Sequence, residues 1–100
     1  MNVKYKKFVS VPANGGAITL DDIPMGIIQI FGTSLSGIIF EYLDKDGNVL
    51  QSGTKNFSGQ KIYDLNQQPN LFFGSKLRII NNSTVERSFY IIIVDRYNPI

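Results

Sequence analysis

The feature that most constrains the fold of this chain is the spacing of its glycines and prolines. They interrupt every stretch of helical length from the N-terminus to Gly74. Because both residues destabilise the interior of a helix, no helix of ordinary length fits between them. After Gly74 the chain is rich in isoleucine, valine, phenylalanine and tyrosine, which favour strands. We therefore predict an all-β fold.

Short apolar runs alternate with turn residues along the chain, a pattern typical of a sandwich or a barrel. The clearest turn is Asp44–Asn48, because its Asp-Gly pair suits a tight hairpin. A second hairpin is expected across Asn81–Thr84, and polar loops are expected at residues 53–60 and 66–70. We predict a single domain over residues 1–100, a two-sheet antiparallel β-sandwich of about eight short strands, with the jelly roll as one form of it. The predicted strands are Val3–Val11, Ala17–Leu20, Ile27–Phe31, Ile38–Leu43, Val49–Ser52, Lys61–Leu65, Lys76–Ile80 and Arg87–Val94.

Composition excludes several kinds of site. The chain contains neither cysteine nor histidine, which rules out disulfides, zinc–thiolate centres, cysteine nucleophiles and the commonest general base. No serine elbow or glycine-rich phosphate loop is present. The segment that starts at Asp44 begins like a calcium loop but lacks the glycine and glutamate that such a loop needs later. We therefore expect no enzymatic activity, no metal and no cofactor.

The last predicted strand is apolar on both of its faces. Phe89, Ile91 and Ile93 share one face, and the residues between and after them form an equally apolar second face. In a two-layer sandwich the outer face of a sheet normally meets water, and no predicted helix covers it. We expect a second copy or another structural subunit to cover these strands; the alternative is that the chain seals them itself. The candidate subunit-interface residues are Tyr90, Ile92, Val94, Ile28 and Ile39.

Basic residues crowd the N-terminal segment, at Lys4, Lys6 and Lys7. The formal net charge of +2 is too small to indicate a polyanionic partner. The lysines fit either a contact with an acidic neighbour or the protection of an exposed edge strand. Near the other end, an apolar residue after Pro99 suits a tail laid on another subunit and equally suits a cap on the chain's own core. Further candidate contacts are therefore Arg96, Tyr97 and Ile100.

Two other classes of function remain open. A carbohydrate-binding module would use loop aromatics as a sugar-stacking platform, and the candidates are Phe57, Tyr63, Phe72, Phe73 and Tyr97. The mixed lysines and aromatics of Lys4–Phe8 occur in single-strand nucleic-acid binders, which leaves a nucleic-acid-binding β-barrel as the second alternative. We rank it below carbohydrate binding, because so short a segment is a weak signal. We also expect no membrane span and no secretory signal, because no apolar run approaches the roughly 20 residues of a spanning helix.

In general character the chain resembles the small β-sandwich proteins of viral particles, such as capsid, head-decoration and tail components. The resemblance is carried by the short single domain, the lack of histidine and cysteine, the asparagine-rich turns and the two-faced isoleucine strands. It implies a non-enzymatic structural protein that self-associates or docks on a larger particle such as a virion. Its expected partners are copies of itself or other structural subunits.

Overall fold

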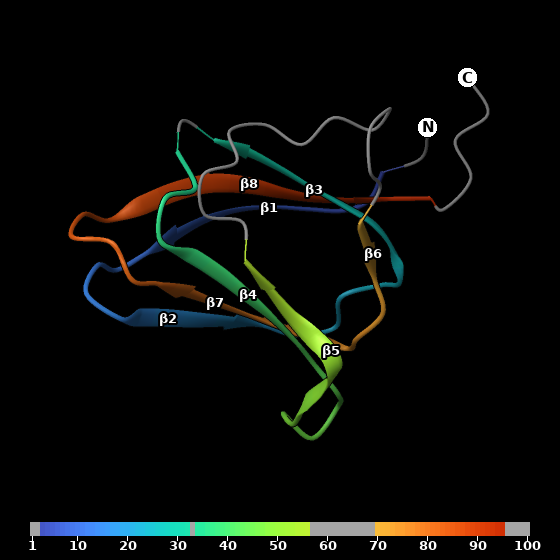
Figure 1. The fold of residues 1–100 in the computed structure, drawn as a ribbon. Helices are drawn as coiled ribbons and strands as arrows, with labels where there is room; N and C mark the ends of the chain where they lie inside the picture. The colour runs from blue at the N-terminus through green and yellow to red at the C-terminus, as the bar shows by residue number, and fades with distance from the viewer. Residues whose placement is uncertain (1–2, 33, 57–69, 96–100) are drawn as a thin grey trace.

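In the computed structural model, strands and short turns follow one another through the described residues, which are 3–32, 34–56 and 70–95 (Figure 1). These residues contain eight strands and no helix, which confirms the all-β prediction. Within them, accordingly, no helix has the length and apolar character needed to span a membrane. The strands are β1 (Val3–Val11), β2 (Gly16–Leu20), β3 (Gly26–Gly32), β4 (Ile38–Leu43), β5 (Val49–Asn56), β6 (Asn70–Phe72), β7 (Lys76–Asn81) and β8 (Arg87–Val94).

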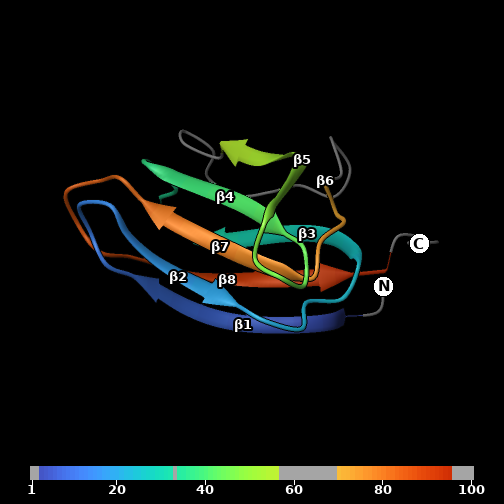
Figure 2. The same ribbon diagram turned by 90° about the horizontal axis from the view of Figure 1, so that it is seen from below.

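The strands form two antiparallel four-stranded sheets, which Figure 2 shows as two layers. The first sheet has the order β1-β8-β3-β6, and the second sheet has the order β2-β7-β4-β5. Four of the pairings are nested, because β1 pairs with β8, β2 with β7, β3 with β6, and β4 with β5. Among the described strands, only β4 and β5 are both consecutive and paired; each other connection passes from one sheet to the other.

The hydrophobic core lies between the two sheets. Successive side chains of a strand point to opposite faces, so alternate residues of each strand enter the core. In β4 these are Ile38, Phe40 and Tyr42, all fully buried. Phe40 stacks against Phe89 of the first sheet with 6.2 Å between ring centroids, and Tyr42 meets Phe72 edge-on at 4.8 Å. These ring contacts tie one layer to the other.

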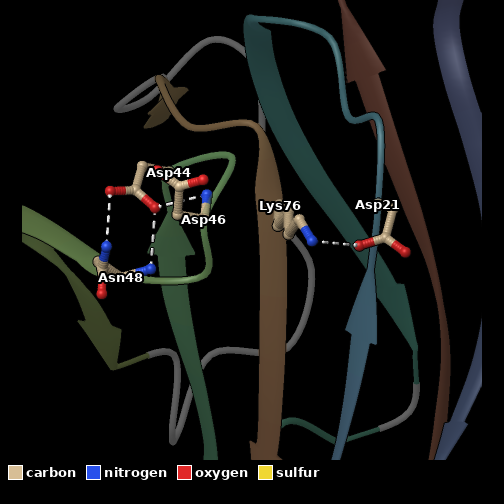
Figure 3. Close-up of polar contacts among 5 residues, drawn as sticks. All are labelled: Asp21, Asp44, Asp46, Asn48 and Lys76. Carbon is tan, nitrogen blue, oxygen red and sulfur yellow. Dashed lines mark hydrogen bonds and ion pairs between the residues drawn. The ribbon is translucent and has the colours of Figure 1, made fainter.

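The predicted hairpin at Asp44–Asn48 is confirmed. It joins β4 to β5, and Gly47 adopts the positive φ of 89° that such a turn requires. The Asp44 carboxylate accepts the backbone N–H groups of Asp46 and Asn48, both at 2.9 Å (Figure 3). These hydrogen bonds, above all the one from Asn48, lower the pKa of Asp44 from its ordinary value. Figure 3 also shows the start of β7, where Lys76 forms an ion pair with Asp21 at 3.4 Å.

Other expectations are corrected by the pairing of the strands. β7 and β8 do not form a hairpin, because β7 pairs with β2 and β4 while β8 pairs with β1 and β3. β5 continues to Asn56, so residues 53–56 belong to a strand and not to the expected loop. Asn70, expected in a loop, begins the short strand β6. The predicted strand Lys61–Leu65 lies outside the described residues.

Asn81, the last residue of β7, links the two sheets through a fully buried side chain. Its Nδ2 donates to the Val11 carbonyl of β1 at 3.0 Å and to the Val85 carbonyl at 2.9 Å. Its Oδ1 accepts the backbone N–H and the hydroxyl of Ser83, at 2.9 and 2.6 Å. The amide thus uses both donors and accepts twice, which is how a buried polar group avoids a desolvation penalty.

Candidate functional site

The outer face of the first sheet carries a row of aromatic side chains. Tyr90 of β8 is the cross-strand partner of Phe8 on β1 and of Phe31 on β3. Directly opposite residues of an antiparallel sheet project from the same face, so the three rings lie side by side across three strands. Phe89, which points the other way, is buried in the core. We call Phe8, Tyr90 and Phe31 the aromatic row.

All three side chains of the aromatic row are exposed, by 53% at Phe8, 43% at Tyr90 and 37% at Phe31. The Phe8 and Tyr90 rings meet edge to face, with 4.9 Å between centroids and 60° between planes. The Lys6 Nζ atom lies 5.1 Å from the centroid of the Tyr90 ring, within the range of a cation–π contact. The rings therefore support one another and still present apolar surface to the outside.

The border of the aromatic row is partly apolar and partly polar. On one side the next cross-strand row contains Lys6, Ile92 and Gln29. On the other side the hydroxyls of Ser10 and Ser88 are hydrogen-bonded at 2.8 Å. No acidic residue occurs within β1, β8, β3 or β6. The face is therefore apolar at its centre and positively charged only toward β1.

This arrangement offers binding contacts. The aromatic row can be covered by an apolar partner, Lys6 can attract a negative or aromatic group, and the serines can form hydrogen bonds. In the part of the chain that the structure describes, no group of three or more aspartates and glutamates is placed to hold a metal ion.

Only two of the five predicted interface residues share an exposed face. Tyr90 and Ile92 both lie on the outer face of the first sheet, Tyr90 exposed and Ile92 half-buried. Val94 follows them on the same strand but is fully buried. Ile28 points inward and belongs to the core, while Ile39 lies on the outer face of the second sheet. These five residues therefore do not form one surface, because Ile28 points into the core, Val94 is buried and Ile39 belongs to the other sheet.

The three N-terminal lysines belong to a paired strand. Within the described residues β1 is an edge of the first sheet, with β8 as its neighbour. Lys4 donates from Nζ to the Met25 carbonyl at 2.6 Å, Lys6 covers Tyr90, and Lys7 is exposed. This placement agrees with the interpretation of lysines on a protected edge strand. The other predicted contacts, Arg96, Tyr97 and Ile100, lie outside the described residues.

Neither Phe8 nor Phe31 was predicted to lie on the surface. The exposure of Phe8 could have been predicted, because this residue lies between Lys6 and Ser10 on the otherwise polar face of β1. The sequence gives no indication that Phe31 is exposed, since it lies near the end of an almost entirely apolar strand. It neighbours Tyr90 only because β3 pairs with β8. The exposed fractions of the side chains and the register of the strands were both needed to recognise the aromatic row.

The loop aromatics proposed as a sugar platform are placed differently from the prediction. Phe72 is fully buried against Tyr42, and Phe73 is partly buried against the same core. The Phe72 ring is therefore not free to stack on a sugar, and the Lys55 Nζ atom lies over the Phe73 ring, 5.8 Å from its centroid. Phe57, Tyr63 and Tyr97 lie outside the described residues.

No protein-family model, no curated protein and no solved structure matches the chain. The aromatic row and its surroundings therefore carry the functional argument.

Proposed function

We propose that this protein is a non-enzymatic structural protein that assembles, with copies of itself or with other structural subunits, through the outer face of its first sheet. The observation that carries the proposal is the aromatic row, three large side chains gathered on one face and left 37–53% exposed. Interaction sites on soluble proteins carry contiguous apolar patches of several hundred Å², and the row supplies the centre of such a patch, to which adjoining residues of the same face must add. The charged fraction of 18%, below the roughly 25% of an average domain, agrees with a surface that a partner partly covers.

We infer further that the two sheets form a jelly roll. In this fold a long antiparallel hairpin is rolled into two sheets, so that the first strand pairs with the last and the central strands are joined by the tip. The nested pairings, with the Asp44–Asn48 turn at the tip, support this assignment. Jelly rolls occur in viral capsids, which agrees with our more specific proposal of a capsid, decoration or tail component of a virion.

Carbohydrate binding is the second candidate, and the same exposed rings favour it. The jelly roll is also a lectin scaffold, and hydroxyl groups lie beside the row at Ser10 and Ser88. A flat sugar face, however, stacks best on coplanar rings, whereas Phe8 and Tyr90 are inclined by 60°. Inclined rings interlock better with the side chains of a protein partner, which is why we rank assembly first.

Light scattering on a sizing column tests the proposal. We expect a wild-type mass above the 11.2 kDa of one chain, and a lower mass for Tyr90→Ser and Phe31→Ser. Val85→Ser is the matched control, because Val85 is 49% exposed but lies outside the strands of the first sheet. Circular dichroism of each variant verifies the fold. A wild-type monomer at every concentration would contradict assembly, and glycan binding lost in Tyr90→Ser would then favour the second candidate.

A further inference from the structure

The outward side of β1 is an open sheet edge. Within the described part of the chain β1 is the longest strand, with 9 residues, and it pairs with β8 alone. Along its other side, backbone N–H and C=O groups can pair with an added strand. Phe8 places one end of the aromatic row on this edge, so the row and the edge form one continuous surface.

The aromatic row alone is too small for a stable interface. At about 200 Å² for a fully uncovered aromatic side chain, its three rings expose roughly 270 Å². A stable complex usually covers about 800 Å² on each partner. A partner of the row must therefore contact the adjoining surface as well, and an added strand at the β1 edge would supply that contact.

We propose that two copies of this chain pair β1 against β1, in antiparallel orientation, about a twofold axis at Phe8. The inference rests on the proposed function and names the partner of the same face, a second copy. The two first sheets become one eight-stranded sheet. The aromatic row then continues from Phe31, Tyr90 and Phe8 of one protomer into the same residues of the other.

Charge disfavours every register centred on residues 4–7. In a symmetric antiparallel pair, facing positions are equidistant from the axis and project from the same face. An axis at Lys4, Lys6 or Lys7 sets that lysine opposite its own copy, and an axis at Tyr5 sets Lys4 opposite Lys6. Like charges in these positions are destabilising. An axis at Phe8 faces no lysine with a lysine.

Geometry favours the same axis. A bulge separates Val3 from Tyr5, so the regular part of β1 runs from Tyr5 to Val11 and has Phe8 at its centre. The proposed register overlaps all of residues 5–11, whereas an axis at Val9 would overlap only residues 7–11.

The facing pairs are chemically compatible. The two Phe8 rings, more than half exposed in the single chain, cover one another at the axis. Lys6 faces Ser10, and both remain at the solvated outer face. Lys7 faces Val9, whose side chain is already buried in the core of its own protomer, and the exposed Lys7 side chain can extend so that its ammonium group stays in water. The pairing therefore buries apolar surface without burying a charge.

The absence of cysteine makes this register accessible to disulfide trapping. We would prepare Lys6→Cys and Ser10→Cys separately, refold them together and oxidise the mixture. In the proposed register the two introduced thiols face each other, with Cβ atoms about 4.5–5.5 Å apart, close to the range of a disulfide. The two copies of position 6 lie four residues apart along the strands, roughly 13 Å.

We expect the mixture to give a disulfide-linked species of twice the 11.2 kDa chain mass, at least tenfold more abundant than from either variant alone. Lys6→Cys mixed with Thr54→Cys is the matched control, because Thr54 is exposed on the second sheet and should not link. Efficient linkage in Lys6→Cys alone would move the axis to Lys6 and overturn the register.

The failure of this inference can be distinguished from the failure of the proposed function. If the mixture links no better than the Thr54→Cys control while Tyr90→Ser still lowers the assembled mass, pairing through β1 is wrong and assembly through the aromatic row stands. If the wild type is a monomer at every concentration, both are wrong. A monomer that instead binds an acidic extended peptide along β1 would assign this edge to a different partner.

Discussion

At the scale of single residues, Asn81 shows how one side chain can hold two sheets together. Its amide donates to carbonyls on β1 and on the segment before β8, and it accepts twice from Ser83. No sequence pattern distinguishes this asparagine from its neighbour Asn82, which is exposed. The difference between them arises only from where the strand ends.

We expect Asn81→Ala to lower the free energy of unfolding by about 2–4 kcal/mol, because the buried Val11 carbonyl loses the Asn81 donor and the Ser83 N–H loses its acceptor. Urea denaturation followed by circular dichroism measures the change. Asn82→Ala is the matched control and should change stability by less than about 0.5 kcal/mol. Equal losses at the two positions would show that water replaces the Asn81 amide.

The residues of the aromatic row show what sequence alone can predict of a site. Tyr90 and Ile92 were identified because β8 is apolar on both faces, a pattern internal to one strand. Phe8 and Phe31 lie far apart in sequence and meet Tyr90 only because β1 and β3 flank β8. A surface assembled from three strands depends on long-range pairing, which the composition of each strand does not encode.

At the scale of elements, the strands bounded by proline, glycine or charged residues were predicted best. β1, β4 and β8 have the predicted bounds, because apolar runs there stop at proline, glycine or charged residues. β6 was missed because three residues are too few to show alternation. The predicted β7–β8 hairpin failed because a short polar connection can equally well cross between sheets.

The β4–β5 hairpin should respond to acid through Asp44. Its pKa is lowered in the folded protein, first by the hydrogen bond from the Asn48 backbone, so the folded state favours the carboxylate. The resulting stabilisation is present above the ordinary pKa of 3.8 and is lost as the pH falls through the lower folded value. We therefore expect the melting temperature to decrease on acidification through this range, and to decrease less in Asp44→Asn.

Thermal melts at a series of pH values measure this effect. Asp46→Asn is the matched control, since Asp46 contributes its backbone N–H to the turn and keeps that contribution after substitution. It should retain the acid response of the wild type. The same response in Asp44→Asn as in the wild type would show that other carboxylates govern acid unfolding.

At the scale of the whole molecule, nested pairing determines the sequence separation between the strands that must pair during folding. β4 and β5 meet across one short turn, whereas β1 must find β8 at the other end of the described chain. Loop closure costs more entropy as the intervening chain lengthens, and all-β domains rich in such contacts fold in about milliseconds to seconds. We expect the β4–β5 hairpin to form early and the β1–β8 pair to form late.

Stopped-flow folding of two variants tests this order. Gly47→Ala strains the turn, where φ is 89°, and should mainly slow folding. Val9→Ala removes core packing from β1 opposite Phe89 and should mainly accelerate unfolding. Slower folding of Val9→Ala together with faster unfolding of Gly47→Ala would instead place the β1–β8 pair in the folding nucleus.

The pairing of Val3 with Val94 brings the two ends of the described chain side by side, so a short linker could join them (Figure 1). A circular permutant could be joined between β8 and β1 and opened within Asp44–Asn48. The same strand pairs would then form in a chain whose termini lie at β5 and β4. β8 and β1 would become a local hairpin, and β4 and β5 would become the most distant pair. The native sheets would be retained while the order of their formation is inverted.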